Sequence, residues 1–346
     1  MATKHIVALR YYGQNRIPAG SGWTGLQGEL ENLGVEIYVE GNNAPPSHLV
    51  VIDWTKQDEA RWPEVPKRNR YLIASECATV NPGQFTERVG QKFSLVYVPS
   101  VFYPKLVNSE VWREGGYFNL DRFKARFSND GRRGGCGLIN ENKFSLVSGS
   151  NYILRTNFIA NAVKNGLPLT IAGRNWNRGL LWTSAKLLHH LLIAARGGRL
   201  NLKLTDALSA LRFATHKRSN TRNYVGAVPD SIEFLSKFKV AVVIENESSY
   251  TSEKLYSAFA AGCQCVYVGP PLDAALFPKG FLFQSEPRAG DIVNAVELAL
   301  NTYYKISEDD IGNWFESGRF FQSEDVRLRN TWLAKDIWAR ITSQLN

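Results

Sequence analysis

The chain lacks any apolar run long enough to cross a bilayer, and it contains few cysteines. No segment approaches the roughly 20 apolar residues that a membrane-spanning helix needs, so any membrane association must be peripheral. Cys263 and Cys265 lie two residues apart, but no other pair of Cys or His has the spacing of a zinc site. The four cysteines are expected to be buried free thiols, which favours a reducing, cytoplasmic compartment. They are Cys77, Cys136, Cys263 and Cys265. The N-terminal stretch shows no signal-peptide pattern.

Acidic residues are outnumbered by basic ones. Lys and Arg total 41 against 32 Asp and Glu, which leaves a net charge of +9. A basic balance suits the phosphates of a small ligand, an acidic membrane surface or nucleic acid, and it can equally be a solubility feature. The sequence has no dense Lys/Arg block and no nucleic-acid-binding motif, so we expect no nucleic-acid partner. Peripheral association with the inner face of a membrane, through this basic surface, is compatible with the composition.

The length of 346 residues exceeds one ordinary hydrophobic core, which predicts two domains. Apolar runs of strand length alternate with helical patterns and indicate an α/β fold with mainly parallel sheets. In the first half we expect a helix at 22–34 and strands at 4–13, 35–41, 48–54, 69–76 and 93–99. In the second half we expect a strand and loop at 143–150 and strands at 167–173, 238–246 and 263–269. We expect helices at 152–166, 183–198, 252–262 and 324–345.

These elements predict an N-terminal domain at 1–137, a C-terminal domain at 138–322, and a last helix at 323–346 that returns to the first domain. The last helix is amphipathic, because Leu333, Ile337 and Ile341 recur every four residues. The polar, Gly-rich stretch that ends at Gly137 is interpreted as an irregular tail and linker.

The stretch "IENESSYTSEK", from Ile244 to Lys254, places charged and hydrogen-bonding side chains directly after a buried strand. The run "VAVVI" before it is continuously apolar, as in a strand that is buried on both faces. A helix that Gly262 ends and a second strand follow, so the elements form a right-handed β-α-β unit. The loop at 245–251 therefore lies at the carboxyl end of a parallel strand, where open α/β sheets bind ligands.

The residue types in this loop suit a nucleoside diphosphate. The helix N-terminus offers free N–H groups and partial positive charge to a phosphate, and Lys254 adds a full charge in the first turn. Glu253 can accept two hydrogen bonds from the vicinal hydroxyls of a ribose, while Asn246 and Tyr250 can position a base or a sugar. A capping motif with Thr251 or Ser249 as the N-cap is the competing interpretation. Capping explains the Ser, Thr and Glu residues, but it does not require Asn246, Tyr250 or Lys254.

From Leu235 to Pro271 the chain reads "LSKFKVAVVIENESSYTSEKLYSAFAAGCQCVYVGPP". This segment resembles the donor-binding signature of the α-1,3/1,4-fucosyltransferases, glycosyltransferase family ten: an apolar strand, E-N, a variable loop, Y-x-T-E-K, a helix, G-x-x-P-V and a G-P-like turn. Here Ser252 stands where Thr is usual, the loop is shorter, and Gln264-Cys265 replaces the usual x-Pro. The resemblance implies a GT-B fold, in which two Rossmann-like domains face a cleft and the C-terminal one binds the donor.

The resemblance also implies roles for residues outside the signature. "NYILRTNFIANAVKNGLPLTIAGRNW" looks like the family's first C-domain helix and next strand, which places Arg155 at an Arg that binds the donor diphosphate. "YLIASECATVNP" resembles the segment that carries the catalytic base, which assigns that role to Glu76. Taken by themselves, Arg155 could be a surface Arg and Glu76 a solvated loop carboxylate. Asp230 matches a frequent family Asp and can be an N-cap or a carboxylate near the anomeric carbon. Glu245 and Ser150 are further candidates for donor contacts.

These interpretations predict an inverting transferase that moves fucose from GDP-fucose to a hydroxyl of a glycan or glycolipid, as in lipopolysaccharide synthesis. Glu76 takes the acceptor proton, and Arg155 and Lys254 neutralise the departing diphosphate. Because the sequence has no D-x-D motif, we expect no metal and no other cofactor. One alternative is a same-fold transferase with another donor, such as a CMP-linked ulosonic acid, using Asp230 or Glu76 as nucleophile. Another is a nucleotide- or carbohydrate-binding module without catalysis. The segment 180–224, longer than the family's usual connection, leaves the sugar and acceptor open.

Overall fold

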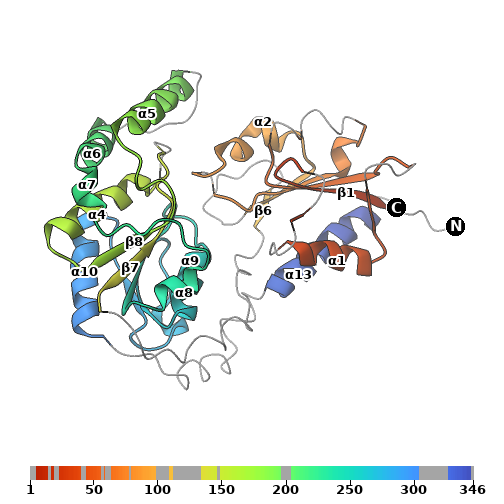
Figure 1. Ribbon diagram of the computed structural model, residues 1–346. Helices are drawn as coiled ribbons and strands as arrows, with labels where there is room; N and C mark the ends of the chain where they lie inside the picture. The colour runs from red at the N-terminus through yellow and green to blue at the C-terminus, as the bar shows by residue number, and fades with distance from the viewer. Residues whose placement is uncertain are drawn as a thin grey trace. The chain divides into compact units, whose positions relative to one another are not determined.

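The computed structural model describes residues 5–14, 17–18, 23–39, 44–55, 58, 64–77, 79–98, 109–111, 134–145, 149–195, 204–303 and 326–343. The chain divides into two compact units (Figure 1). Unit 1 comprises Met1–Phe118 and Phe320–Asn346, and unit 2 comprises Asn119–Arg319. Each unit contains one parallel sheet, which confirms the prediction of two α/β units. In the described part of the chain, no helix combines the length and the apolar character needed to cross a membrane.

The unit 1 sheet has six strands in the order β2-β1-β3-β4-β5-β6, and every neighbouring pair is parallel. The strands are β1 (Ile6–Tyr11), β2 (Glu36–Ile37), β3 (His48–Ile52), β4 (Arg70–Ile73), β5 (Leu95–Val98) and β6 (Ser109–Val111). Short helical turns lie between them: η2 (Lys67–Asn69), η3 (Pro82–Phe85) and α2 (Glu87–Gly90). Every residue of β3 is buried, as expected for an inner strand of a sheet that is covered on both faces.

The last helix of the chain belongs to unit 1. Figure 1 shows α13 (Val326–Ser343) beside α1 (Thr24–Asn32), and the two helices contact each other. Leu333, Ile337 and Ile341, on the apolar face that the sequence predicts, are buried in one cluster with side chains from α1, β1 and β3. Residues from the two ends of the chain therefore share one core.

The unit 2 sheet has five parallel strands in the order β11-β10-β9-β7-β8. The strands are β7 (Cys136–Ile139), β8 (Leu169–Ala172), β9 (Val240–Ile244), β10 (Gln264–Val268) and β11 (Leu282–Gln284). The helices are α4 (Tyr152–Lys164), α5 (Leu180–Ala195), α6 (Leu204–Thr215), α7 (Lys217–Asn220), α8 (Ser231–Leu235), α9 (Glu253–Ala260), α10 (Ala289–Asn301) and the turn η4 (Ala274–Leu276).

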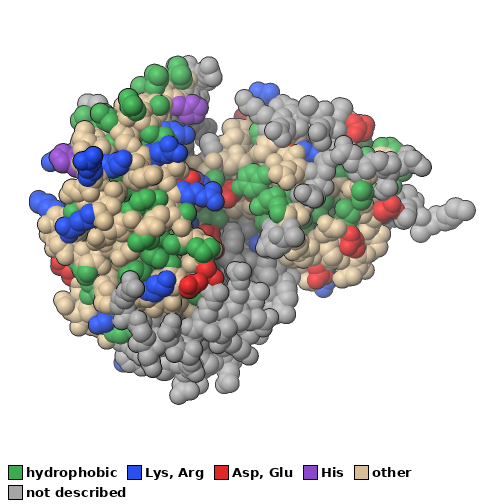
Figure 2. Space-filling model, viewed as in Figure 1, with side chains coloured by type: hydrophobic (Ala, Val, Ile, Leu, Met, Phe, Trp, Pro, Cys, Tyr) green, Lys and Arg blue, Asp and Glu red, His purple; other side chains and the backbone are tan. Residues whose placement is uncertain are grey.

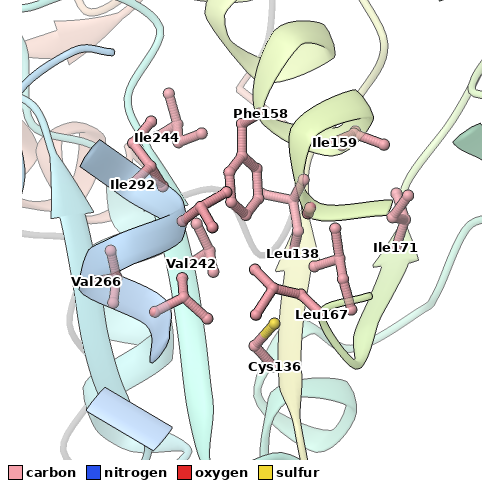
Figure 3. Packing of buried hydrophobic residues seen from close by; sticks show 14 of the residues in the cluster. Cys136, Leu138, Phe158, Ile159, Leu167, Ile171, Val242, Ile244, Val266 and Ile292 are labelled. Carbon is pink, nitrogen blue, oxygen red and sulfur yellow. The ribbon is translucent and has the colours of Figure 1, made fainter. Parts of the chain in front are cut away.

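The main core of unit 2 lies between the sheet and the pair α4 and α10. Figure 3 shows Phe158 and Ile159 of α4 and Ile292 of α10 against Leu138 and Val242 of the central strands. On the other side of this sheet α9 packs against β9 and β10 with α8 beside it, as right-handed crossovers require. The four cysteines are free and buried, as the sequence indicates.

The first predicted strand of the second half is not observed where the sequence places it. A strand and loop are predicted at 143–150, of which 146–148 lie outside the described residues, whereas the observed strand is β7 and residues 140–145 are irregular. β7 is hard to recognise because it contains Gly137, and a Cβ at that position would lie 2.7 Å from the Phe238 ring. Unit 2 thus begins before the boundary predicted between residues 137 and 138, since β7 is part of its sheet.

Candidate functional site

The strand order of unit 2 reverses between β7 and β9. From β7 the chain passes through α4 to β8 on one side, and from β9 it passes through α9 to β10 on the other side. Open α/β sheets bind ligands outside the carboxyl ends of the strands at such a switch point. The loops after the two strands meet there, because Ser150 forms a bridge with Glu247 and the Asn151 N–H donates to the Asn246 carbonyl at 2.9 Å. The predicted loop at 245–251 therefore lies at this switch point.

Two helices begin beside these loops. α4 begins at Tyr152 and α9 begins at Glu253. The first turn of each helix has backbone N–H groups without partners inside the helix and carries partial positive charge. Asn151 precedes α4 but makes no side-chain cap hydrogen bond. The switch point therefore offers donors from two helices to an anion such as a phosphate.

Glu245 fixes the start of α9. Its fully buried carboxylate accepts hydrogen bonds from the Ser252 N–H at 2.9 Å and the Ser252 hydroxyl at 2.6 Å. The N-cap of α9 is Ser252 and not the predicted Thr251 or Ser249, and its Oγ accepts from the Lys254 N–H at 3.4 Å. Burial raises the pKa of Glu245, and the nearby Lys254 opposes that rise. Glu245 thus acts within the protein, as a clamp between the end of β9 and the helix.

Lys254 lies in the first turn of α9 with its ammonium directed back to the helix start. Its Nζ is 2.9 Å from Ser252 Oγ and 3.6 Å from a Glu253 carboxylate oxygen. The Lys254 side chain is 17% exposed and that of Glu253 is 55% exposed. Lys254 is the main cause of a lowered pKa at Glu253, which is therefore held ionised. A half-buried cation and an exposed carboxylate thus flank the helix N-terminus, as a diphosphate and a ribose require.

Arg155 does not face solvent, as a residue that binds a phosphate directly would. It lies on α4 and is 2% exposed, and its guanidinium donates to the Ile244 carbonyl at 3.1 Å from Nε and 2.6 Å from a terminal nitrogen. The same terminal nitrogen donates to Asn246 Oδ1 at 2.9 Å. The guanidinium also lies over the Tyr152 ring at 4.9 Å. These contacts hold the end of β9 and orient Asn246, and the positive charge of Arg155 contributes to the lowered pKa of Glu253.

The other predicted residues are placed as follows. Tyr250 is buried at 4% exposure, so its ring is largely covered by protein. Ser150 precedes α4, and its Oγ accepts from the Tyr152 N–H at 3.3 Å. Asp230 is the N-cap of α8 and accepts from two backbone N–H groups at 2.9 and 3.0 Å. The capping interpretation thus accounts for the carboxylate of Asp230.

Two buried amides at the switch point were missed by the sequence interpretation. Asn140, directly after β7, is 3% exposed, and among the described residues neither its Nδ2 nor its Oδ1 has a hydrogen-bond partner. Asn151 is 7% exposed, and its Nδ2 also lacks one there. Buried amides are nearly always paired in proteins, so such groups call for a ligand or water. A polar residue directly after a strand is the sequence signal for Asn140, but β7 itself was not recognised. Asn151 is the residue directly before α4.

Unit 1 has an equivalent switch point between β1 and β3. Tyr12 follows β1, Asp53 follows β3 and Glu76 lies just after β4. Tyr12 and Asp53 have φ angles of 47° and 55°, in the left-handed region that bulky residues rarely adopt. Such backbone strain clusters at functional sites. Glu76, the predicted base, is half-buried in this group.

Asp53 organises the backbone that carries Glu76. It is fully buried and accepts hydrogen bonds from the N–H groups of Ser75 and Glu76, both at 2.9 Å, from the Ser75 hydroxyl, and from Gln84 at 3.2 Å. Gln84 also donates to the Glu76 carbonyl at 2.9 Å. Burial raises the pKa of Asp53, and the hydrogen bonds it accepts oppose that rise. The strand predicted at 48–54 contains Asp53, but the sequence interpretation assigned this residue no role.

Tyr12 lies beside both carboxylates. Burial, the charges of Asp53 and Glu76, and a side-chain hydrogen bond with Glu76 raise the pKa of Tyr12 above its ordinary value. Tyr12 therefore stays a neutral hydrogen-bond donor at physiological pH. The described residues contain no group of three His, Cys, Asp or Glu that could hold a metal ion.

No protein-family model and no curated protein matches the chain. Solved structures match its fold. The structure of Anabaena HepE in complex with UDP and glucose is 11% identical, with a TM-score of 0.53, over 97% of this chain and 100% of that one. A glycosyltransferase from Rickettsia africae is 10% identical, with a TM-score of 0.50, over 98% and 99% of the two chains. The chain thus has the GT-B fold.

An α1,3-fucosyltransferase also matches, at 12% identity over 94% of this chain and 93% of that one. Its TM-score of 0.43 is too low to support membership of family ten, which stays a prediction.

Proposed function

We propose that the protein is a glycosyltransferase that moves a sugar from a nucleotide-sugar donor to a hydroxyl of a glycan or glycolipid acceptor. The observation that carries the proposal is the unit 2 switch point. Two helix N-termini, the Lys254 ammonium and buried amides without partners among the described residues gather there in a chain with the GT-B fold. This set of groups suits a diphosphate and the sugars attached to it.

In the proposed reaction an acceptor hydroxyl attacks the anomeric carbon while Glu76 takes the hydroxyl proton. The bond between that carbon and the diphosphate oxygen breaks, and the nucleoside diphosphate leaves with the electron pair. Single displacement of this kind inverts the anomeric centre. Lys254 and the helix N-termini stabilise the charge on the leaving group. Arg155 contributes mainly by holding Asn246 and the end of β9. The resemblance implies a different role for it, a direct contact with the phosphate.

The donor that the sequence resemblance favours is GDP-fucose, with Glu253 at the ribose. A UDP-sugar is the second candidate, because HepE, which shares the fold, was solved with UDP and with glucose. In both cases we propose that no metal is needed, since Lys254 and the helix N-termini can take the place of a divalent cation.

The experiment is a thermal-shift screen of GDP, UDP, CMP and their sugar conjugates, with and without EDTA. A ligand that binds only the folded state raises the melting temperature. We expect one nucleoside diphosphate to stabilise the wild type, and the Lys254→Ala variant to lose the shift. Lys164→Ala, at the exposed far end of α4, is the matched control and should keep it.

Transfer is then measured with the sugar of the nucleotide that binds. Binding without transfer or hydrolysis of any donor would favour a non-catalytic module. Stabilisation by CMP alone would favour an ulosonic-acid donor, and a covalent sugar–carboxylate adduct would replace inversion by double displacement.

A further inference from the structure

The helix α5 exposes an unusual amount of apolar side chain. Large hydrophobic residues are rarely exposed in contiguous groups on monomeric soluble proteins. Among the described residues, ten large hydrophobics are exposed, and six of them lie on α5 and the adjacent α6. These six are Leu180, Leu181, Leu188, Leu191, Leu192 and Leu208.

The leucines of α5 form a stripe. Leu181, Leu188 and Leu192 are seven and four residues apart, which places them on one face of the helix. They are 89%, 58% and 49% exposed. The helix packs against α6, and Thr183 on a different face is buried. Figure 2 shows hydrophobic side chains gathered over this end of unit 2. The stripe is therefore directed to solvent and covers no core.

The segment that carries this stripe is strongly basic. Between Asn142 and Pro229 the sequence has thirteen Lys and Arg residues and a single acidic residue, Asp206. This imbalance exceeds the net charge of +9 of the whole chain. Lys186 lies on α5 itself, with its Nζ 5.9 Å from the centre of the Trp182 ring. Figure 2 shows Lys and Arg side chains on the adjacent surface of the unit. Exposed bases on or beside α5–α7 include Arg178, Arg212, Arg218 and Arg222.

We propose that α5 is a docking surface for an anionic lipid bilayer. In this arrangement the leucine stripe enters the boundary between headgroups and acyl chains, and the surrounding Lys and Arg contact the lipid phosphates. Helices that combine an apolar face with a cationic surround bind membranes in this way. Each basic residue near an anionic leaflet adds to the attraction.

The charge and the apolar character of the α5 surface argue against two other occupants, a second copy of the chain and a glycan. A second copy of the chain would bring two strongly cationic segments together, which is electrostatically unfavourable. A glycan would satisfy few of its hydroxyls against leucine side chains, which neither donate nor accept hydrogen bonds. An anionic bilayer complements the charge and the apolar character together. The proposal is independent of the donor chemistry, because α5 contributes none of the donor-site residues described above.

The test is co-sedimentation with vesicles of phosphatidylcholine alone or with about 30% phosphatidylglycerol, a composition that gives the surface negative charge. We expect the wild type to bind the anionic vesicles and to be released at about 1 M salt, where screening is short-ranged. The double variant Leu188→Glu/Leu192→Glu should bind at least about tenfold more weakly, because it removes apolar contact and adds negative charge.

Leu298→Glu is the matched control, since Leu298 lies on α10 of the same unit and is 54% exposed. It should bind like the wild type. All variants should keep the wild-type melting temperature and nucleotide-induced shift, because the substituted positions are exposed. Equal binding of the double variant and the wild type overturns the proposal, as does equal binding to neutral and anionic vesicles. A wild-type dimer that the double variant converts to a monomer also overturns it, in favour of a second copy.

Discussion

The carboxyl edges of the two sheets have the same topology and opposite chemistry. In both units the chain runs from its first strand, β1 or β7, to a neighbouring strand at one edge of the sheet. The remaining strands follow in order on the other side of that first strand. At the switch point of unit 1 the chain gathers the carboxylates of Asp53 and Glu76 around Tyr12. At that of unit 2 it gathers two helix N-termini and Lys254. Topology thus fixes where the loops meet, and the residues after each strand decide whether that edge is acidic or basic.

Both edges also rely on a fully buried carboxylate that faces protein groups. Asp53 holds the backbone of Glu76, and Glu245 holds Ser252 at the start of α9. In each case the buried acid accepts backbone and hydroxyl hydrogen bonds, and the functional candidate is a neighbour that is more exposed. Positioning and chemistry are therefore assigned to different residues in both units.

The largest expected effect is at the acidic edge. Glu76→Gln keeps the shape of the side chain and removes proton acceptance, so kcat should fall about a hundred- to ten-thousand-fold. Nucleotide affinity and melting temperature should stay at wild-type values, because the donor groups belong to unit 2. Steady-state kinetics and calorimetry on the same preparation separate the two quantities. Near-normal turnover by a folded, nucleotide-binding variant would remove Glu76 as the base.

The second prediction concerns acid stability, which should differ between the units. Burial, with a contribution from His5, lowers the pKa of His48 in β3 from 6.5 to about 4. The folded state therefore resists protonation of His48. The stability associated with neutral His48 is complete above pH 6.5 and is lost as the pH falls towards 4, by up to about 3 kcal/mol.

The centroid of the His5 ring lies 5.6 Å from that of the His48 ring and 5.6 Å from that of the Trp338 ring in α13. Protonation of His48 should therefore loosen the contact with the last helix. Hydrogen exchange between pH 7 and pH 4 should show loss of protection in β1, β3 and α13 before β7 and β9. His48→Gln should flatten this dependence. An unchanged pH profile in that variant would assign the acid sensitivity to other groups.

At the cationic edge the expected effect is on binding. Lys254→Ala removes a charge-assisted contact worth about 1.5–3 kcal/mol, so nucleotide affinity should fall about ten- to a hundred-fold. Lys164→Ala serves as the control for a change of net charge. If titration calorimetry gives the same affinity for wild type and Lys254→Ala, Lys254 has no part in the donor site.

The smallest effect is expected at Tyr12. Tyr12→Phe removes the hydroxyl that hydrogen-bonds Glu76, and a net loss of about 1 kcal/mol corresponds to a roughly fivefold lower kcat. Nucleotide affinity should not change, which distinguishes this variant from Lys254→Ala. A fall in affinity with unchanged kcat would reverse the assignment of Tyr12 to the acidic edge.

Most strands and helices could be predicted because their signals are local. Continuous apolar runs predict β3 and β9, and the glycines after α1 and α4 adopt the positive φ angles that end helices: 88° at Gly34 and 70° at Gly166. β7 could not be predicted, because its glycine is required by the neighbouring Phe238, and that contact spans a hundred residues of sequence. The three-residue strand β11 was also missed. So was α10, although its buried residues Ile292, Val296 and Ala299 recur at helical spacing.

The location of the candidate residues at strand ends was predictable. A loop after a buried strand pointed to the Glu245–Lys254 region, whereas Glu76 was selected through the family resemblance, and both assignments stay predictions. The division of roles was not predictable, because it depends on burial. Arg155 faces a backbone carbonyl, Glu245 faces a serine and Tyr250 is covered, whereas Glu253 is exposed. Asn140 and Asn151 became candidates only through the structure, in which both are buried and have side-chain atoms without a hydrogen-bond partner among the described residues.

The position of α13 has a consequence for how the protein is made. Unit 2 is continuous in sequence, whereas unit 1 contains residues from both ends of the chain. On the ribosome, unit 2 can complete its core as soon as Arg319 has emerged. The apolar face of unit 1 that receives Leu333, Ile337 and Ile341 stays uncovered until α13 has been translated. The part that is translated first is therefore the part that folds last, and a chain that is cut short before α13 leaves that face open to chaperones or to aggregation.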